Sequence, residues 1–291
     1  MNRSTQADIA LLFVVILWSI SFSLAKEALS WVTPILFVIL RFLLAGVIWL
    51  VLYGSLLKGA KAGTWWRGLL LGFVLGVGFV LQTAGLALTR ASMSGFITGL
   101  AVVFVPFFVI FLERKLPKLT SLAGVVICAA GLWILTSPAG AGFNRGDLMT
   151  VGAAVMYALY IVLVEIFTSE YDPRVLTLVQ AAGIMLAALP AMILLEAPSM
   201  TWNWPLIWRW LVLGTMAAVT LAIQLYWQRF ISATRAAVIF TLEQPLAAVF
   251  AFLILGELLT GAAYMGGGII FLGLLVAEGG ARLIPHRLSD S

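Results

Sequence analysis

Two strongly charged residues, Arg41 and Glu243, lie deep inside apolar stretches of the sequence. At a rise of ~1.5 Å per residue, each is expected about 12 Å from the same side of a membrane. A charge at the centre of a membrane helix costs about 2.5–3.5 kcal/mol on insertion scales, so it needs a partner or a function. The two residues therefore predict either a buried ion pair that fixes helix packing, or groups that handle the charged ends of a zwitterion or a coupling proton.

Glu243 is followed by an amide and a proline, Gln244 and Pro245. A proline inside a helix removes a backbone donor and frees the carbonyl four residues earlier, here that of Thr241. One helical turn would then gather a carboxylate, an amide and an unpaired carbonyl. The corresponding stretch of the first half has Pro106 about one turn out of register, between apolar neighbours. Polar recognition is therefore predicted to come mainly from the second half.

Aromatic and neutral polar residues lie at similar depth. Trp18, Tyr157 and Tyr160 predict an apolar wall for a ligand, or else ordinary aromatic packing. Amides and hydroxyls in a membrane bind a substrate or link helices to one another, and hydroxyls also bond to their own helix. The candidates of this kind are Ser21, Gln82, Ser94, Thr98 and Gln224.

An internal repeat relates these residues to one another. Offsets of 139 and 142 residues bring polar and proline positions into register, which is informative because matches of Gly, Ala or Leu are common in so apolar a chain. The matched pairs are Asp8 with Asp147, Trp18 with Tyr157, Lys26 with Glu165, Pro34 with Pro173, Arg67 with Arg209 and Gln82 with Gln224. A repeat with an odd number of spans enters the membrane in opposite orientations, which is typical of secondary transporters with a site near the midplane.

The composition indicates a membrane protein, with 63% hydrophobic and 10% charged residues and a mean hydropathy of +1.12. Runs of about 20 apolar residues match the ~30 Å hydrocarbon core of a bilayer. They predict an all-α polytopic fold of ten transmembrane helices in two inverted five-helix repeats. The predicted spans are 8–28, 33–54, 64–87, 90–112, 118–137, 146–168, 173–196, 204–227, 231–254 and 260–280.

The domain organisation follows from the repeat and from a turn-rich stretch between its halves. We expect a first repeat over 1–137, a connecting loop over 138–146, a second repeat over 147–281 and a tail over 282–291. With this topology, twelve Lys and Arg fall on the side of the N-terminus and four on the other side. The positive-inside rule then places both termini in the cytoplasm.

The charge distribution and the scarce reactive side chains exclude other classes of protein. The net charge of +5 is explained by topology, so no nucleic-acid partner is expected. The single cysteine and single histidine argue against a disulfide, a thiolate metal site and a hydrolytic triad. We expect no enzyme activity, no metal and no cofactor. A membrane-embedded enzyme or a receptor without transport remains a rival, which a flux assay would distinguish.

These motifs resemble those of the drug/metabolite transporter superfamily, and specifically its EamA-type ten-helix exporters. The resemblance covers both halves, although Ser19 stands where the family typically has glycine. The matching residues are Leu17-Trp18-Ser19 with Lys26, then Arg41, Glu243-Gln244-Pro245 and Gly256-Glu257-Leu258-Leu259-Thr260. The resemblance implies a central cavity formed by spans one, three, four, six, eight and nine, which opens alternately to the two sides.

The nearest likeness is to bacterial inner-membrane exporters of aromatic amino acids. The expected function is export of amino acids, aromatic or large neutral ones, with a small-molecule substrate and the lipid bilayer as partners. The alternative is an exporter of other small metabolites or drugs, such as organic cations or nucleotide-type compounds. Oligomeric state and proton coupling stay open at this point.

Overall fold

A computed structural model describes residues 2–113, 119–136, 143–258 and 260–279 of the 291. Within these ranges the chain is helical, and its one strand-like feature is an isolated bridge between Val32 and Met200. The elements are α1 (Arg3–Ala28), α2 (Pro34–Tyr53), the 3₁₀ helix η1 (Gly54–Gly59), α3 (Ala62–Leu88), α4 (Ala91–Thr98), α5 (Ala101–Glu113), α6 (Leu119–Thr136), α7 (Arg145–Thr168), α8 (Pro173–Leu195), α9 (Trp204–Gln228), α10 (Ala233–Phe240), α11 (Glu243–Leu255) and α12 (Gly261–Gly279).

The prediction of an all-α membrane fold is confirmed. Eight helical segments of the described chain are long and apolar enough to cross a membrane: α1, α2 with η1, α3, α4 with α5, α7, α8, α9, and α10 with α11. The helices α6 and α12, of 18 and 19 residues, complete the ten predicted segments. Most of the predicted loop at 138–146 and all of the tail at 282–291 lie outside the described residues.

Local sequence explains where several helices begin. Pro34 and Pro173, which the repeat aligns, occupy the first position of α2 and α8. A proline is favoured there because its missing N–H would have no intrahelical partner anyway. The side chain of Asn144 forms a capping box with Asp147 at the start of α7. A proline at the first position therefore starts the equivalent helices α2 and α8 in the two halves.

The predicted spans 90–112 and 231–254 are each built from two helices joined by a tight turn. The fourth span breaks between α4 and α5 at Gly99 and Leu100, and the ninth breaks between α10 and α11 at Thr241 and Leu242. Tight turns carry the chain across both breaks, with Leu100 N donating to Ile97 O at 3.0 Å and Leu242 N to Ile239 O at 3.2 Å.

The prolines explain only one of these two breaks. Pro245 lies in the first turn of α11, where the absence of a backbone N–H costs little. Pro106, in contrast, lies inside α5, after the break. The two breaks are nevertheless equivalent in the repeat, because Gly99 and Thr241 are 142 residues apart. The interruption is thus a property of the repeated fold rather than of the proline position.

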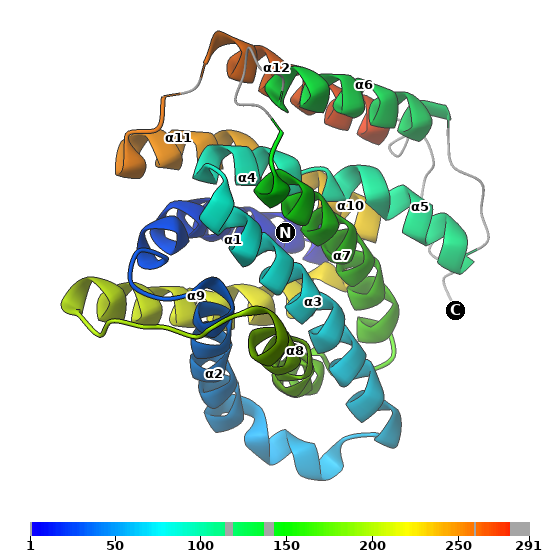
Figure 1. Ribbon diagram of the computed structural model, residues 1–291. Helices are drawn as coiled ribbons and strands as arrows, with labels where there is room; N and C mark the ends of the chain where they lie inside the picture. The colour runs from blue at the N-terminus through cyan, green and yellow to red at the C-terminus, as the bar shows by residue number, and fades with distance from the viewer. Residues whose placement is uncertain (1, 114–118, 137–142, 259, 280–291) are drawn as a thin grey trace.

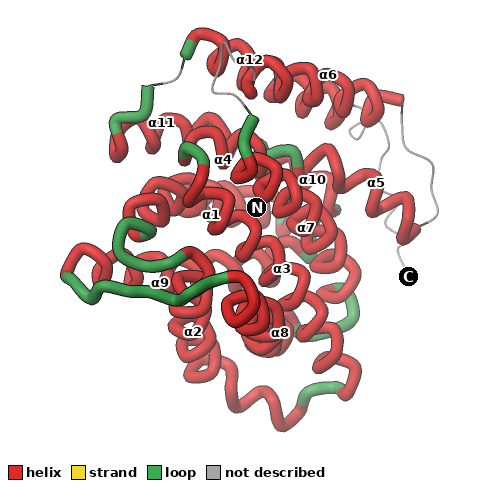
Figure 2. The backbone as a smooth tube through the Cα atoms, in the orientation of Figure 1, coloured by secondary structure: helices red, strands yellow, loops and turns green. Residues whose placement is uncertain are grey.

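The two halves interlock, so that neither forms a separate body. Helix α3 packs against α7 and α8 of the second half, and its repeat mate α9 packs against α1 and α2 of the first. The remaining pair, α6 and α12, lie along each other at one edge of the molecule (Figures 1 and 2). The centre of the molecule is therefore built from both repeats.

Glycine allows the closest of these helix contacts. A Cβ added at Gly72 of α3 would lie 2.0 Å from the carbonyl oxygen of Gln180 in α8. Conversely, a Cβ at Gly183 of α8 would lie 2.2 Å from the carbonyl oxygen of Leu69. Small residues permit such backbone approach between membrane helices. The α3–α8 contact therefore requires glycine on both helices.

Polar side chains hold the connection between α3 and α4 at the end of the bundle opposite the start of α1. Lys26 Nζ donates to the carbonyls of Leu86 and Thr89, both at 2.7 Å. Glu257 accepts hydrogen bonds from the backbone N–H of Ala91 at 2.9 Å and of Ser92 at 3.1 Å. A cation on the last carbonyls of α3 and a carboxylate on the first N–H groups of α4 match the two helix dipoles.

Candidate functional site

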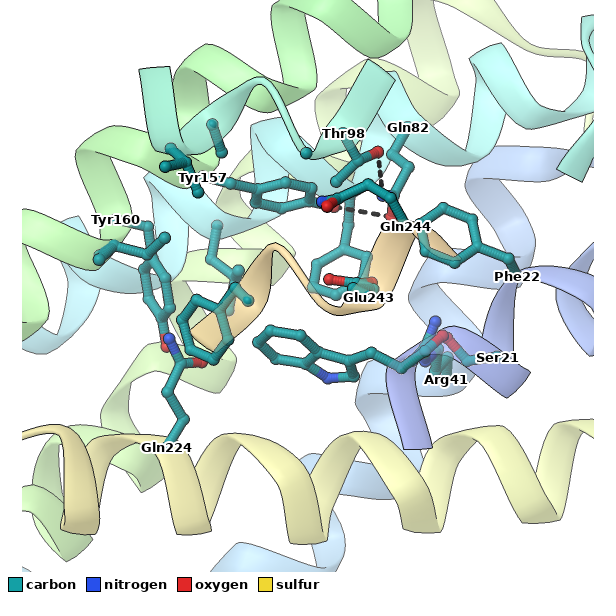
Figure 3. A pocket seen from close by; sticks show the side chains of 18 residues that line it. Ser21, Phe22, Arg41, Gln82, Thr98, Tyr157, Tyr160, Gln224, Glu243 and Gln244 are labelled. Atoms are coloured by element: carbon teal, nitrogen blue, oxygen red, sulfur yellow. Dashed lines mark hydrogen bonds between the residues drawn. The ribbon is translucent and has the colours of Figure 1, made fainter. Parts of the chain in front are cut away.

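A cavity lies at the centre of the molecule, where α1, α3, α7 and α9 surround the two helix breaks (Figure 3). It encloses about 70 Å³. Ten of the residues singled out from the sequence line it: Trp18, Ser21, Arg41, Gln82, Thr98, Tyr157, Tyr160, Gln224, Glu243 and Gln244. The fold thus brings together side chains that are up to 226 residues apart in the sequence.

Ser94 is the candidate that the structure does not place at this cavity. It lies one helical turn before Thr98 in α4, is fully buried, and its hydroxyl has no hydrogen-bond partner among the described residues. Helical spacing put both residues on one face, as expected, but the cavity reaches only the end of α4. Depth along the helix, rather than its face, separates Ser94 from Thr98.

A hydrogen-bond network joins three helices on one wall of the cavity. The hydroxyl of Tyr157 donates to Gln82 Oε1 at 2.9 Å, and Gln82 Nε2 donates to Thr98 Oγ1 at 3.1 Å (Figure 3). Gln82 is therefore oriented by its neighbours, with its oxygen toward α7 and its nitrogen toward α4. Of the two roles expected for this amide, the structure contains the interhelical link.

Gln224, the repeat mate of Gln82, has a different environment, which its neighbour Gln228 determines. Gln228 donates from Nε2 to the carbonyl of Ile161 at 2.7 Å, so its own Oε1 must act as the acceptor. Gln224 Nε2 donates to that oxygen at 3.0 Å. As a result Gln224 Oε1, which is buried and without a partner, is left as a free acceptor on a side chain that lines the cavity. Such an orphan acceptor is costly unless a ligand or water binds it.

Hydrogen bonds to other helices hold Trp18 and Tyr160 in place and leave their rings facing the cavity. Trp18 Nε1 donates to Thr220 Oγ1 at 3.0 Å, and its ring lies 5.3 Å from that of Phe240. The hydroxyl of Tyr160 donates to Gln180 Oε1 in α8 at 3.0 Å. Satisfying the polar atom of each ring elsewhere leaves mainly apolar surface toward the cavity.

Arg41 and Glu243 face the same cavity without forming an ion pair. Arg41 donates from Nε to the carbonyl of Leu213 at 3.2 Å, and its guanidinium carbon lies 5.2 Å from the centre of the Phe79 ring. No described residue donates a hydrogen bond to the Glu243 carboxylate, although the backbone carbonyl of Glu243 accepts one from Ser19 Oγ at 3.2 Å. Both side chains are almost fully buried. Of the two arrangements considered from the sequence, the ion pair is therefore absent, and the two side chains face the cavity separately.

The helix breaks add backbone polarity to the site. Glu243 is the first residue of α11, next to the positive end of that helix dipole. Helix α5 begins in the same region at Ala101, while α4 and α10 end there at Thr98 and Phe240. The backbone stays in the right-handed helical region at Gly99, Thr241 and Leu242, so each break is a tight turn between two helices. In transporters, helix ends at mid-membrane depth contact substrates and ions.

The lining residues follow the internal repeat closely. At an offset of 139 or 142 they form the pairs Trp18–Tyr157, Ser21–Tyr160, Phe22–Ile161, Gln82–Gln224, Thr98–Phe240, Ala101–Glu243 and Val102–Gln244. Sequence reasoning missed the apolar members Ala101, Val102 and Phe240, which the repeat register would have found as the mates of chosen residues. It also missed Phe22 and Ile161, which are mates of each other. Leu75, Phe79 and Gly99, also missed, carry no such signal. The only carboxylate of this lining is that of Glu243, in the second half, and its repeat mate in the first half is Ala101.

Known proteins match the chain along nearly its full length. The sequence profile of the EamA-like transporter family matches twice, over residues 5–137 and 144–278. Two uncharacterized transporters of Archaeoglobus fulgidus are 27% and 25% identical over 273 and 281 residues. These alignments cover 94% and 92% of this chain, and 85% and 97% of the relatives.

A solved protein crystal structure has the same fold. It superposes with a TM-score of 0.66 at 22% identity, over 98% of this chain and 100% of the other. Within the described residues, no group of three or more His, Cys, Asp or Glu side chains is arranged to hold a metal ion. The double profile match, the helical membrane fold and the central cavity together establish that this chain is a multi-pass membrane transporter that belongs to the EamA-like transporter family.

Proposed function

We propose that the protein exports amino acids, aromatic or large neutral ones, across the cell inner membrane by alternating access. The observation that carries this proposal is the separation of Arg41 and Glu243, two buried ionisable side chains, one basic and one acidic, that face one aromatic-lined cavity without pairing. A zwitterion would supply the missing counter-charge to both. A substrate with one charge would leave the other side chain uncompensated in a region of low dielectric.

The lining residues suggest a role for each end of such a substrate. The ammonium group would bind Glu243 together with the free oxygens of Gln224 and Gln244, which are both buried acceptors without a partner. The carboxylate would bind Arg41, whose guanidinium makes a single hydrogen bond to a described residue. The rings of Trp18 and Phe240 would pack against the side chain, because aromatic faces favour apolar and aromatic groups.

The size of the cavity bears on the transport cycle. Ligand pockets measure about 300–1,000 Å³, whereas the central cavity encloses about 70 Å³. This small volume supports a cycle in which the helices around the cavity move apart when a substrate binds. The breaks at Gly99 and Thr241 are the natural positions for this movement, because chain without regular helical hydrogen bonds changes its dihedral angles most easily.

The first experiment is flux of tryptophan and phenylalanine into liposomes that hold the purified protein, with and without a pH gradient. Glu243→Gln is expected to lower this flux by at least about tenfold, equivalent to ~1.4 kcal/mol, because a neutral amide cannot balance the ammonium charge. Glu170→Gln removes an exposed carboxylate and serves as the matched control. Full activity of Glu243→Gln would contradict the role of this carboxylate, and absence of flux by folded wild-type protein would contradict the substrate.

The alternative substrate class is an organic cation or a related drug. Glu243 and the free amide oxygens favour a cation equally well, and only Arg41 distinguishes the two classes. Arg41→Gln is expected to abolish amino-acid flux if Arg41 binds a carboxylate. Retained flux of an organic cation such as ethidium in that variant, with little amino-acid flux in wild type, would favour the alternative. Nucleotide-type substrates are disfavoured, because Arg41 is the only cationic side chain of the lining.

A further inference from the structure

A second cavity of about 400 Å³ lies beside the first, between α11 and α12. Helix α12 follows α11 in the chain but packs along α6 instead, and the two consecutive helices stand apart (Figure 1). The space between them is lined mainly by apolar side chains and glycine, with Gln244, Glu257 and Tyr264 as its polar members. Small residues, Ala248 on α11 and Gly268 on α12, leave it open, whereas Gly267 allows the ring of Phe96 to approach α12.

The position of this cavity determines what can fill it. It is flanked by side chains that are exposed on the membrane-facing surface, with Val249 51%, Phe252 53% and Tyr264 64% exposed. Val249 and Phe252 belong to a candidate membrane span, and Tyr264 begins a shorter apolar stretch of α12, so we infer that the cavity opens to the lipid-facing surface. Apolar space at this depth is occupied by hydrocarbon, because the bilayer core supplies no water.

The length of the cavity fits one leaflet. Along α11 it extends from Gln244 to Phe252, a distance of about 12 Å at ~1.5 Å per residue, and Glu257 lies beyond Phe252. Half of the ~30 Å hydrocarbon core is about 15 Å. The long axis of the cavity therefore matches a single acyl chain that enters from the end of the bundle where Glu257 binds the start of α4.

Gln244 separates this cavity from the central one. Among the described residues it is the only one that lines both cavities. Its side chain crosses from α11 to the break between α4 and α5, where a Cβ added at Gly99 would lie 2.0 Å from Gln244 Nε2. The amide thus closes the space between the two broken spans. Its oxygen is buried and has no hydrogen-bond partner among the described residues.

We propose that the α11–α12 cavity binds one acyl chain of a bilayer lipid, and that Gln244 is the partition that keeps this chain out of the central cavity. The polar amide suits this position, because it presents a polar surface to the substrate side and excludes hydrocarbon. The lipid site and the central cavity then share a wall that is a single side chain thick.

The lipid site is tested by photo-cross-linking of the full-length protein in vesicles of phosphatidylethanolamine and phosphatidylglycerol. The probe is a phosphatidylcholine whose acyl chain ends in a diazirine, and mass spectrometry locates its adducts. Adducts are expected on residues 248–252 and 264–271. Gly268→Phe should remove most of them, because a Cβ at Gly268 has open space around it and the ring would occupy the cavity.

The matched control is Gly261→Phe, at the other open glycine of α12, which does not line the cavity. Its adducts should equal those of wild type. Adducts that persist in Gly268→Phe, or that spread evenly over exposed positions elsewhere, such as Ile193 and Leu194 of α8, would overturn the lipid site. This readout requires no transport, so it stands or falls separately from the proposed substrate.

The partition is tested with the same probe and Gln244→Ala. In wild type no adduct is expected on Trp18 or Phe240, whereas in Gln244→Ala adducts should appear on both, because the truncated side chain joins the two cavities. Gel filtration and an unchanged pattern on 264–271 would show that the variant is folded. Adducts confined to the outer cavity in a folded Gln244→Ala protein would contradict the partition.

Discussion

At the scale of single residues, the free oxygen of Gln224 depends on a neighbour that does not line the central cavity. Gln228 accepts the hydrogen bond that fixes the Gln224 amide, and its own orientation is imposed by the carbonyl of Ile161. Gln228→Leu removes this constraint and lets Gln224 turn its N–H₂ group toward the ligand. Affinity for phenylalanine is expected to fall about tenfold, since a hydrogen bond to a charged group contributes ~1.5 kcal/mol or more.

Isothermal titration calorimetry on the detergent-solubilised protein would measure this loss. A double-mutant cycle separates positioning from a direct role of Gln228. In a Gln224→Leu background, Gln228→Leu should cause little further loss, because the group that it orients is already gone. Additive losses would show that Gln228 acts by another route.

The ring of Trp18 belongs to the same scale, because its contribution depends on one contact surface. It lies against Phe240 on the cavity, and its N–H is bound by Thr220. Trp18→Ala is expected to reduce flux of tryptophan and phenylalanine more than flux of alanine, since only large side chains reach the lost surface. Competition assays in liposomes would measure the ratio, and an equal reduction for all three substrates would refute the aromatic wall.

At the scale of elements, the two halves use opposite charges for equivalent purposes. Lys26 and Glu165 are repeat mates, yet Lys26 binds the carbonyls that end α3, whereas Glu165 accepts from the N–H of Ala233 at 2.6 Å, at the start of α10. A cation suits the negative end of a helix dipole and a carboxylate suits the positive end. The difference in charge between the halves therefore follows from which helix end each side chain meets.

This contact leads to a prediction about stability. Lys26→Met leaves the carbonyls of Leu86 and Thr89 without the Nζ donor, and we expect the free energy of unfolding to fall by about 1–3 kcal/mol. Thermal unfolding followed by tryptophan fluorescence would measure the change. Lys58→Met, at an exposed lysine of η1, is the control and should have little effect. Equal melting temperatures for both variants would contradict the role of Lys26.

At the scale of the whole molecule, the charge distribution predicts the orientation in the membrane. With the Lys- and Arg-rich end in the cytoplasm, Ser55 in η1 lies on the cytoplasmic side of the membrane and Thr201, between α8 and α9, lies on the opposite side. Both residues are exposed. In a Cys128→Ala background, a membrane-impermeant maleimide added to intact cells should label Thr201→Cys and leave Ser55→Cys unlabelled. The reverse pattern would mean that the molecule is inserted the other way round.

Much of the site could be predicted from the sequence because the repeat relates distant positions. Trp18 with Tyr157 and Gln82 with Gln224 could be chosen as pairs before any contact was known, and all four line one cavity. Ser94 does not line this cavity, because helical spacing identifies a face but not where along the helix a cavity ends. No proline marks the break at Gly99, since the nearest one, Pro106, lies seven residues further on, inside α5.

The amino-acid sequence by itself determined the membrane class, the number of helical segments and the register of the two repeats, because hydrophobic length and periodicity are properties of the chain alone. Only the tertiary structure decided that Arg41 and Glu243 remain apart, which way the amide of Gln224 turns, and that α12 leaves α11 to pack on α6. These outcomes depend on distances and directions between segments that are far apart in the chain. Hydrogen bonds and charges act over a few ångströms, so the identities of the residues do not reveal them until the fold has set their positions.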